Sequence, residues 1–352
     1  MWGVFVYGVA IKRESKGRMN EQVRIALPSK GRMEGETLEF LANCGLRVNK
    51  TNPRQYTATI PALPGVTVMF MRPRDIPVSV SSGDMDLGIT GYDTVYDAFG
   101  GETEELMLVH EALDYGQCAL VLAVPMEWTE VHTVQDLTVK ATQQELRVAT
   151  KYRNSVERFL EERRISGIRV VSADGALEAA PSIGYADFIA DITSSGTTLR
   201  ENNLRSLEDG LIVDSQAVLI GNRTALATRP AVMAATEQLL EFIEAYMNAH
   251  GKYMIFANMR GETLDEVAHL VLGQPDLGGL QWPTISPLGT QAHHGNWWSV
   301  SIVVSHSRLY PAIQQFRTIG GSGVVVTPVS YIFEERPERC RRLLSIVQGV
   351  QP

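Results

Sequence analysis

The chain has 352 residues, of which 44% are hydrophobic and 20% are charged, and its formal net charge at pH 7 is −8. This length predicts two or three domains, and the composition is that of an ordinary globular protein. The negative charge argues against a general nucleic-acid-binding surface, although a few arginines in a cleft can still bind nucleotides.

The first residues are apolar but do not form a predicted membrane span. Met1–Ile11 is too short to cross a bilayer and has no basic leader. We therefore treat residues 1–22 as an N-terminal extension and favour a start nearer Met19 over a targeting signal, although a transit role stays open. The isolated cysteines fit a cytoplasmic protein in a reducing compartment: Cys44, Cys118 and Cys340.

From Val23 to Leu113 the sequence alternates short apolar strands with helical stretches, which predicts an α/β domain. The expected elements are strands at 23–27, 66–70 and 86–90 and helices at 33–44, 76–81 and after Gly91.

A second α/β pattern begins at the apolar strand 118–124 and is followed by a further strand at 217–220. Its other expected elements are strands at 147–150 and 168–171 and a helix at 155–164. Two similar lobes without a long linker predict a cleft in which a ligand binds at the carboxyl ends of strands.

The most informative segment is Ala186–Arg200. Its apolar start predicts a buried strand, and Thr193–Thr198 then supplies hydroxyls and a glycine before a helical pattern begins. Backbone N–H groups in such a loop bind anions. Because the Asp191 carboxylate would repel a phosphate unless it held ribose hydroxyls or Mg²⁺, the pattern indicates a sugar phosphate. On residue types alone, an ordinary N-cap loop is an equal alternative.

The last third of the chain follows a different pattern. Residues 231–250 form a long helical pattern that we interpret as a connector, and His293 and His294 fall in an expected hairpin loop. The expected elements after the connector are strand 253–257, helix 264–272, strands 282–285 and 298–304, helix 309–319 and strand 324–327. This βαββαβ order predicts a ferredoxin-like unit, a fold that does not by itself establish a sensor or an interface.

Five segments occur in an order that carries a family resemblance. They are 24–32, 71–77 with 86–93, 147–152, 174–181 and 186–200. Together they resemble the ATP phosphoribosyltransferase family, whose members catalyse the first step of histidine biosynthesis. The resemblance implies transfer of the phosphoribosyl group from phosphoribosyl diphosphate to N1 of ATP with release of pyrophosphate.

The resemblance also implies the fold. It predicts an α/β, bilobal periplasmic-binding-protein-like catalytic core with a C-terminal ferredoxin-like (βαββαβ) domain. Lobe I would comprise residues 23–114 plus about 211–230, with crossings near Asp114 and Leu211, and lobe II would comprise 115–210. The regulatory domain would comprise 251–350 and bind histidine as a feedback inhibitor within Tyr253–Leu288. A homo-oligomer is implied, with dimers assembled into hexamers.

The implied reaction requires stabilisation of the charge on its leaving group and needs no covalent nucleophile. Pyrophosphate leaves with several negative charges, so cations and Mg²⁺ are expected to supply most of the acceleration. Arg72 and Arg74 follow the strand that ends near Met71. The resemblance favours Arg72 as a catalytic phosphate contact, whereas a solvated helix start is the favoured interpretation of Arg74. Lys30 and Arg32 are candidates for binding the polyphosphate of ATP, with a basic surface turn as the alternative.

Three further residues are candidates for binding the nucleotide. Asp93 could accept from a ribose hydroxyl, although on residue type alone a helix cap is favoured. Tyr152 could offer its ring and hydroxyl to a nucleotide or pack against its lobe. Glu178 is a candidate for ribose or metal-bound water, with the first turn of a helix as the alternative.

The resemblance assigns the binding of phosphoribosyl diphosphate to the loop after the strand. The assigned residues are Asp191, Ser194, Ser195, Gly196, Thr197 and Thr198. Asp191, with Glu178, is also the candidate metal ligand and is counted as catalytic. Asp187 lies about 13 Å from Asp191 along a strand, so we give Asp187 a strand-start role instead.

Two rival functions remain. The first is a cytoplasmic bilobal sensor that closes on an anion and binds an amino acid in its last domain. The second is phosphoribosyl transfer to another base, which the loop would also permit. The Asp191 carboxylate weakens the sensor alternative, because a pure anion receptor gains little from a carboxylate in its loop.

Overall fold

The computed structural model describes residues 22–50, 52, 55–173, 175, 177–289 and 296–348. His293, His294 and nearly all of the expected N-terminal extension lie outside these ranges. The chain forms two compact units, one made of the residues up to Leu240 together with those from Glu338, and the other of Glu241–Pro337. No helix in the described ranges combines the length and apolar character needed to cross a membrane.

Lobe I of the first unit contains a six-stranded sheet in the order β2-β3-β1-β4-β11-β5. Strand β1 pairs in parallel with β3 and β4, so the carboxyl ends of these three strands lie at one edge of the sheet. The elements of this lobe are β1 (Val23–Pro28), α2 (Gly31–Asn43), β2 (Thr57–Thr59), β3 (Val66–Met71), α3 (Asp75–Ser81), β4 (Leu87–Gly91), α4 (Tyr92–Phe99), β5 (Leu106–His110), β11 (Ala217–Asn222) and α8 (Arg223–Thr228).

Lobe II contains a five-stranded sheet in the order β10-β6-β9-β7-β8. Strand β9 pairs in parallel with β7 and antiparallel with β6, and Phe188 and Ile189 of β9 are fully buried. The elements of this lobe are β6 (Cys118–Pro125), α5 (Val134–Gln143), β7 (Leu146–Thr150), α6 (Arg153–Glu162), β8 (Ile168–Ser172), the 3₁₀ helix η1 (Leu177–Ala179), β9 (Phe188–Thr193), α7 (Thr197–Glu201) and β10 (Leu204–Ser215).

The chain passes between the lobes twice, and the return lies later than the expected crossing near Leu211. Strand β10 continues to Ser215, pairing Leu211–Ser215 with β6 in lobe II, and β11 enters the lobe I sheet only at Ala217. The boundary at about 211 was therefore wrong by a few residues. Two irregularities in the β10–β6 register allow this long strand to bend as it continues.

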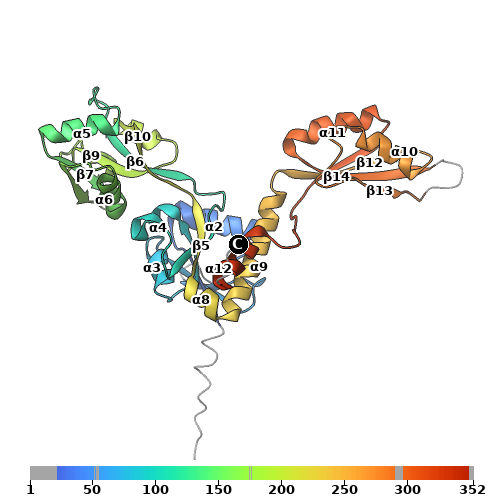
Figure 1. Ribbon diagram of the computed structural model, residues 1–352, viewed down its shortest axis with the longest axis horizontal. Coiled ribbons are helices and arrows are strands. Elements are labelled where there is room, and N and C mark those ends of the chain that lie inside the picture. The colour runs from blue at the N-terminus through green and yellow to red at the C-terminus, as the bar shows by residue number, and fades with distance from the viewer. Residues whose placement is uncertain are drawn as a thin grey trace, which may run out of the picture. The chain divides into compact units, whose positions relative to one another are not determined.

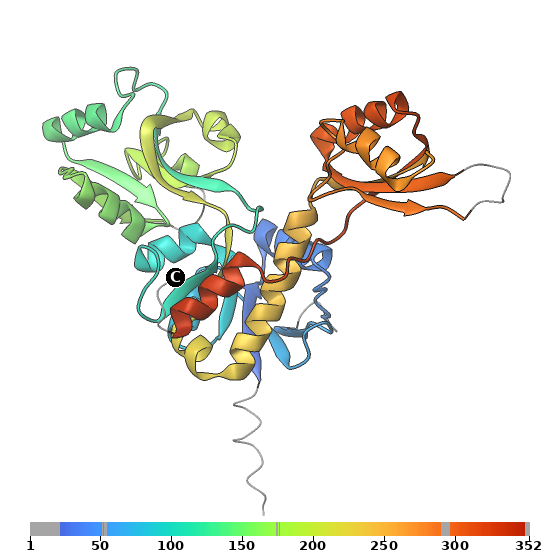
Figure 2. The ribbon, with the colours of Figure 1, turned by 45° about the vertical axis from the view of Figure 1, so that its right-hand side comes forward.

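Helix α9 (Pro230–Ala249) begins in the first unit and ends in the second. It occupies the position of the connector expected at 231–250. The chain later returns to the first unit as α12 (Glu338–Gln348), where Cys340 and Leu343 are buried. Figures 1 and 2 show α12 beside α9, and the Cys340 Sγ lies 3.9 Å from the Glu237 carbonyl oxygen. The expected regulatory domain 251–350 was therefore too long, because α12 belongs to the catalytic unit.

The second unit is an antiparallel sheet in the order β13-β14-β12-β15, with two helices over one face. With β12 and β14 adjacent at the centre, this is the ferredoxin-like arrangement predicted from the βαββαβ pattern. The elements are β12 (Lys252–Arg260), α10 (Leu264–Leu272), β13 (Thr284–Pro287), β14 (Trp297–Ser305), α11 (His306–Thr318) and β15 (Ser322–Pro328). On the opposite face, Phe256 and Val325 are register partners and remain 40% and 59% exposed.

Candidate active site

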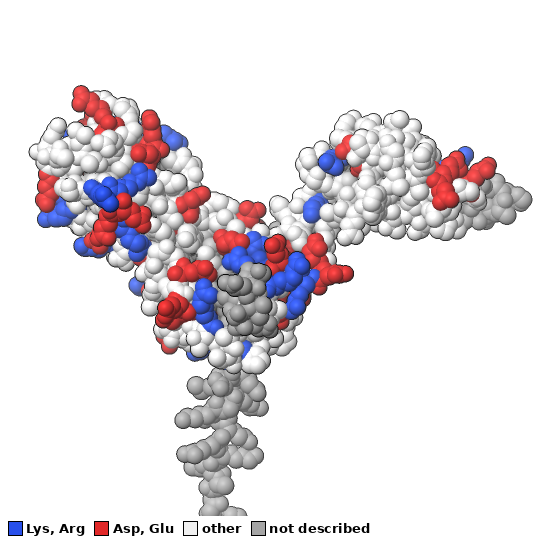
Figure 3. All heavy atoms as spheres, in the orientation of Figure 1, with Lys and Arg blue, Asp and Glu red and all other residues white. Residues whose placement is uncertain are grey.

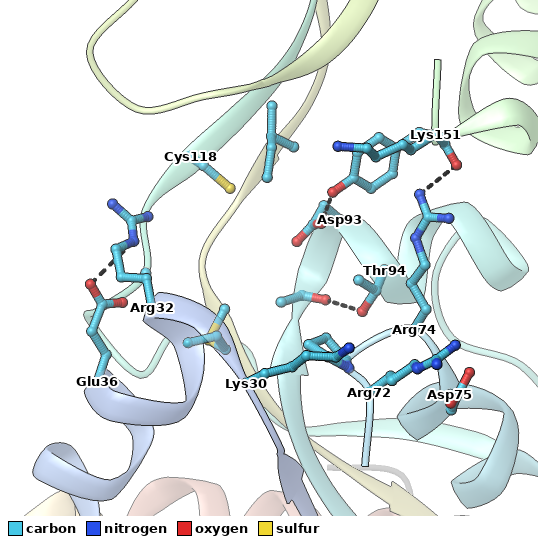
Figure 4. A pocket seen from close by; sticks show the side chains of 16 residues that line it. Lys30, Arg32, Glu36, Arg72, Arg74, Asp75, Asp93, Thr94, Cys118 and Lys151 are labelled. Atoms are coloured by element: carbon cyan, nitrogen blue, oxygen red, sulfur yellow. Dashed lines mark hydrogen bonds and ion pairs between the residues drawn. The ribbon is translucent and has the colours of Figure 1, made fainter. Parts of the chain in front are cut away.

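The carboxyl ends of three lobe I strands border a cavity of about 820 Å³ (Figure 4). Lys30 follows β1, Arg72 follows β3 and Asp93 follows β4, so the parallel pairing of these strands brings together residues that are far apart in sequence. Lobe II contributes Lys151, Tyr152 and Ile192 to the same cavity.

The cavity is rich in cations that have different environments. Lys30 and Arg72 are exposed, and neither side chain has a hydrogen bond or ion pair with the described residues. Arg32 is 3.3 Å from a carboxylate oxygen of Glu36, one helical turn further along α2. Lys30 and Arg72 can thus meet a polyphosphate without first breaking a protein contact.

Asp93 and Tyr152 contact each other across the two lobes. The Tyr152 hydroxyl donates to one Asp93 carboxylate oxygen at 2.9 Å, and the Ser215 hydroxyl donates to the other at 2.9 Å. Burial, reinforced by the Asp93 charge, raises the pKa of Tyr152, so its hydroxyl remains a donor. The N-cap of α4 is Gly91, with Asp93 inside the helix, so the capping interpretation of Asp93 was wrong.

The loop after β9 is organised by its own hydroxyls. Thr193 Oγ1 accepts from the Gly196 N–H at 2.9 Å, and Gly196 has a φ of +69°, a left-handed conformation that suits glycine. The Ser195 hydroxyl donates to Thr197 Oγ1 at 3.0 Å, and Ser194 and Thr198 are exposed. The five-residue α7 begins directly after this turn.

Asp191 is a buried carboxylate at the end of β9, 9% exposed. Its Oδ1 accepts from the Ile192 N–H at 2.9 Å. Burial raises the pKa of Asp191, and the Glu178 charge acts in the same direction, whereas the Ile192 hydrogen bond and the Lys151 charge oppose the shift. Asp191 itself does not line the 820 Å³ cavity, but its neighbours Ile192 and Lys151 do.

Glu178 was expected among the nucleotide-binding residues, and the structure places it elsewhere. It lies in η1 and, with Asp187, lines a separate cavity of about 500 Å³. Within the described ranges no three or more histidine, cysteine, aspartate or glutamate side chains gather as a metal site. Asp191 and Glu178, which influence each other electrostatically, could at most provide a pair of carboxylates for a metal that phosphates also bind.

Two cations of the cavity had no ligand role assigned from the sequence. Lys151 lies in the segment 147–152 but received no role. Arg74 was expected at a solvated helix start and is the exposed N-cap residue of α3, but it also lines the cavity. In the structure Arg74 donates to the Lys151 carbonyl at 2.5 Å and lies 5.2 Å from the centre of the Tyr152 ring. The only signal available from sequence was that Arg74 and Lys151 both follow the ends of predicted strands.

The fold and the cavity define the class of this protein. It has a bilobal periplasmic-binding-protein-like α/β core with a cationic cavity bordered by both lobes, followed by a ferredoxin-like domain. A family model described as ATP phosphoribosyltransferase matches residues 72–245, and one described as HisG, C-terminal domain matches 249–331. The chain belongs to the ATP phosphoribosyltransferase family, in its long form, and is a pentosyltransferase.

Individual relatives are similar over most of their lengths. ATP phosphoribosyltransferase 2, chloroplastic, of Arabidopsis thaliana is 44% identical over 92% of this chain and 80% of its own. ATP phosphoribosyltransferase of Metallosphaera sedula is 33% identical over 89% of this chain and 100% of its own. Among solved structures, a chain of the ATP phosphoribosyl transferase (HisG:HisZ) complex from Thermotoga maritima has a TM-score of 0.50 and 25% identity, covering 63% of this chain and 98% of its own.

Proposed function

We propose that this protein transfers the 5-phosphoribosyl group of phosphoribosyl diphosphate to N1 of ATP and releases pyrophosphate, the first step of histidine biosynthesis. The observation that carries the proposal is a cavity bordered on lobe I by Lys30 and Arg72, which have no ion pair with the described residues. Through Ile192 this cavity adjoins the hydroxyl-rich loop of lobe II. In the reaction the C1–O bond breaks with its electron pair going to pyrophosphate, and the N1 lone pair forms the new bond to C1.

Lys30, Arg32 and Arg72 bind the phosphates of ATP in this proposal. Arg72 suits the catalytic role because its planar guanidinium can donate two hydrogen bonds to developing phosphate charge. Arg32 keeps its orientation through Glu36, whereas Lys30 and Arg72 have no ion pair with a described residue that would have to break before they bind the substrate.

The loop of lobe II binds the ribose phosphate. The hydroxyls and backbone N–H groups of residues 194–198 receive the 5-phosphate, and Asp191 accepts from the ribose hydroxyls. The preformed turn at Gly196 supports this role because it lowers the ordering cost of binding. Ribose donors would also offset the cost of keeping Asp191 buried and charged.

Phosphoribosyltransferases generally require a divalent metal, and we propose Mg²⁺ here. Mg²⁺ usually keeps several waters and binds one or two carboxylates together with substrate phosphates. Asp191 and Glu178 are the proposed protein partners, and the metal would neutralise charge on the departing pyrophosphate.

Asp93 and Tyr152 remain proposed members of the nucleotide site, with a role set by their mutual contact. The carboxylate oxygens of Asp93 already accept from two protein hydroxyls. We therefore propose that the Tyr152 ring borders the nucleotide while Asp93 holds its hydroxyl. A ribose contact by Asp93 would require one of these hydrogen bonds to be exchanged.

Feedback inhibition by histidine is proposed for the ferredoxin-like unit. A cavity of about 380 Å³ in this unit overlaps the expected effector region and includes Lys252, Trp282 and Glu334. A cation and a carboxylate in one small cavity match the carboxylate and ammonium of an amino acid. The variants Lys252→Met and Glu334→Gln should weaken inhibition while leaving uninhibited turnover unchanged, and retained inhibition in both would place the effector elsewhere.

We also propose a cytoplasmic homo-oligomer of dimers assembled into hexamers. The exposed apolar pair Phe256 and Val325 on the uncovered sheet face supports assembly, since burying apolar surface favours association. The interspersed charges on the face in Figure 3 fit a protein that does not bind nucleic acid in general. Light scattering with and without histidine tests the assembly, and cell fractionation tests the compartment.

The deciding experiment supplies ATP, phosphoribosyl diphosphate and Mg²⁺ and follows the N1-phosphoribosyl adenine product, with and without histidine. Product that decreases with histidine supports both proposals, and product without inhibition supports only the catalytic one. No product despite binding of phosphoribosyl diphosphate would favour another acceptor base. Binding of histidine without any transfer to a base would favour the sensor.

A further inference from the structure

Lys151 occupies the short connection between β7 and α6 and joins the two halves of the candidate site. It is half-buried and lines the 820 Å³ cavity with Arg72 and Lys30, yet it comes from the lobe that carries Asp191. Its charge is close enough to Asp191 to oppose the rise in pKa that burial causes in that carboxyl. Its ammonium has no hydrogen bond or ion pair with the described residues, so it is available to an anion.

Residues of lobe I fix the backbone around Lys151. Arg74 donates to the Lys151 carbonyl at 2.5 Å and stacks over Tyr152, whose hydroxyl is held by Asp93 at 2.9 Å. Just beyond, the Ser155 N–H and hydroxyl each donate to an oxygen of the Asp97 carboxylate at 2.9 Å. The start of α6 therefore receives its side-chain cap from α4 of the other lobe, because its own N-cap residue, Tyr152, provides none.

These contacts orient a cation that would otherwise be a flexible surface lysine. Because the backbone at Lys151 is already ordered, a bound phosphate has to order only the lysine side chain. The contacts exist only while the two lobes are apposed. The position of Lys151 is thus coupled to the arrangement in which both substrates meet.

We propose that Lys151 is a further catalytic residue, which contacts the diphosphate of phosphoribosyl diphosphate as it leaves C1, and that Arg74 is the positioning residue that holds Lys151 there. This inference rests on the proposed function. If Asp191 binds the ribose, C1 lies between Asp191 and the cavity, and Lys151 borders that space. Lys151 supplies positive charge to the departing oxygen and transfers no proton. The bonds that break and form, C1–O and N1–C1, are therefore those of the proposed reaction.

The test compares Lys151→Met and Lys151→Arg with Arg153→Ala. Arg153 is a matched control, since it is a cation two residues further along, it pairs with Glu157 at 2.7 Å, and it does not line the cavity. We expect Lys151→Met to lower kcat by on the order of 10²-fold, with a much smaller change in KM for ATP. Lys151→Arg should recover part of the loss, and Arg153→Ala should stay within about twofold of wild type.

A binding measurement separates this inference from the proposed function. Calorimetric titration with Mg²⁺-pyrophosphate requires no turnover, and Lys151→Met should lower the affinity by about tenfold. If the wild type proves inactive, the proposed function fails while the pyrophosphate affinity still decides whether Lys151 binds the diphosphate. Wild-type kcat and unchanged pyrophosphate affinity in a folded Lys151→Met variant would overturn the catalytic assignment.

The role of Arg74 is tested by a double-mutant cycle. Arg74→Ala should lower kcat, and Arg74→Lys should restore only part of it because lysine lacks the planar stack on Tyr152. In the Lys151→Met background, Arg74→Ala should cause little further loss, since the residue it positions is already absent. Fully additive losses would show that Arg74 acts independently of Lys151.

Discussion

Two aspartates lie near opposite ends of strand β9, and the fold gives them opposite environments. Asp187, immediately before the strand, accepts from the Arg147 backbone N–H at 2.7 Å and from its guanidinium at 3.2 Å. Although burial alone would raise its pKa, these hydrogen bonds outweigh that effect and lower the pKa of Asp187. Asp191, at the other end, is more buried and has a raised pKa.

The difference separates a charge that serves the fold from a charge kept for a ligand. A carboxylate with a lowered pKa stabilises the folded state at neutral pH, whereas one with a raised pKa destabilises it. The same contrast separates two arginines, because Arg147 is paired with Asp187 while Arg72 has no ion pair with the described residues. Groups that the protein leaves unsatisfied are therefore the better candidates for function.

The largest expected effect is that of Asp191→Asn. Losing the ribose contact should lower kcat by on the order of 10³-fold. The same variant should be more stable than wild type at pH 7, because it removes a charge that is costly to bury. Steady-state kinetics and thermal unfolding of one preparation measure both effects, and a variant that is less stable than wild type would refute the comparison.

Replacing each of the two arginines by alanine tests the contrast between a charge without a described ion pair and a paired charge. Arg72→Ala should lower kcat by on the order of 10²-fold with an unchanged melting temperature, since Arg72 forms no side-chain hydrogen bond or ion pair with the described residues. Arg147→Ala is the matched control and should lower the melting temperature with little effect on kcat. Near-normal turnover in Arg72→Ala would remove this residue from the site.

A smaller effect is expected for Asp187→Asn. The variant weakens charge-assisted hydrogen bonds to Arg147 and should lower the free energy of unfolding by about 1 to 2 kcal/mol. Urea titration measures the loss, and kcat should change little because Asp187 does not line the 820 Å³ cavity. A large loss of activity without a loss of stability would give Asp187 a functional role instead.

The pH dependence of stability should show opposite signs for the two aspartates. The raised folded-state pKa of Asp191 means that its contribution is most favourable below the unfolded pKa of about 4 and is lost as the pH rises. The lowered pKa of Asp187 means that its contribution is present above about 4 and is lost as the pH falls. Urea midpoints at pH 4 and pH 7 should therefore show the advantage of Asp191→Asn growing with pH.

Sequence predicted individual elements well where the local pattern was strong. Helix 264–272 coincides with α10, and the apolar strands 66–70 and 118–124 lie within β3 and β6. The ferredoxin-like order followed from the strand and helix pattern, and the strand-start role of Asp187 is confirmed by its hydrogen bonds to Arg147. These features depend on periodicity and on contacts that a strand geometry already constrains.

Elements with weaker patterns were not predicted. Strand β10 is 12 residues long but largely polar and irregular, and α12 contains four charged residues in its first five. The long-range packing of Cys340 and Leu343, rather than intrinsic helical preference, places α12 on the catalytic unit. Neither the later crossing at residue 216 nor the shorter ferredoxin-like unit could be read from local sequence.

The sequence by itself determined the fold class, the strand ends that carry Lys30 and Arg72, and the loop after β9. These follow from hydrophobic periodicity and from the order of the motifs along the chain. Only the tertiary structure decided that Asp93 is held by Tyr152 and Ser215, that Glu178 lies in another cavity, and that Arg74 reaches Lys151. The physical reason is that burial and pairing of a charged side chain depend on neighbours from distant segments, which no local pattern specifies.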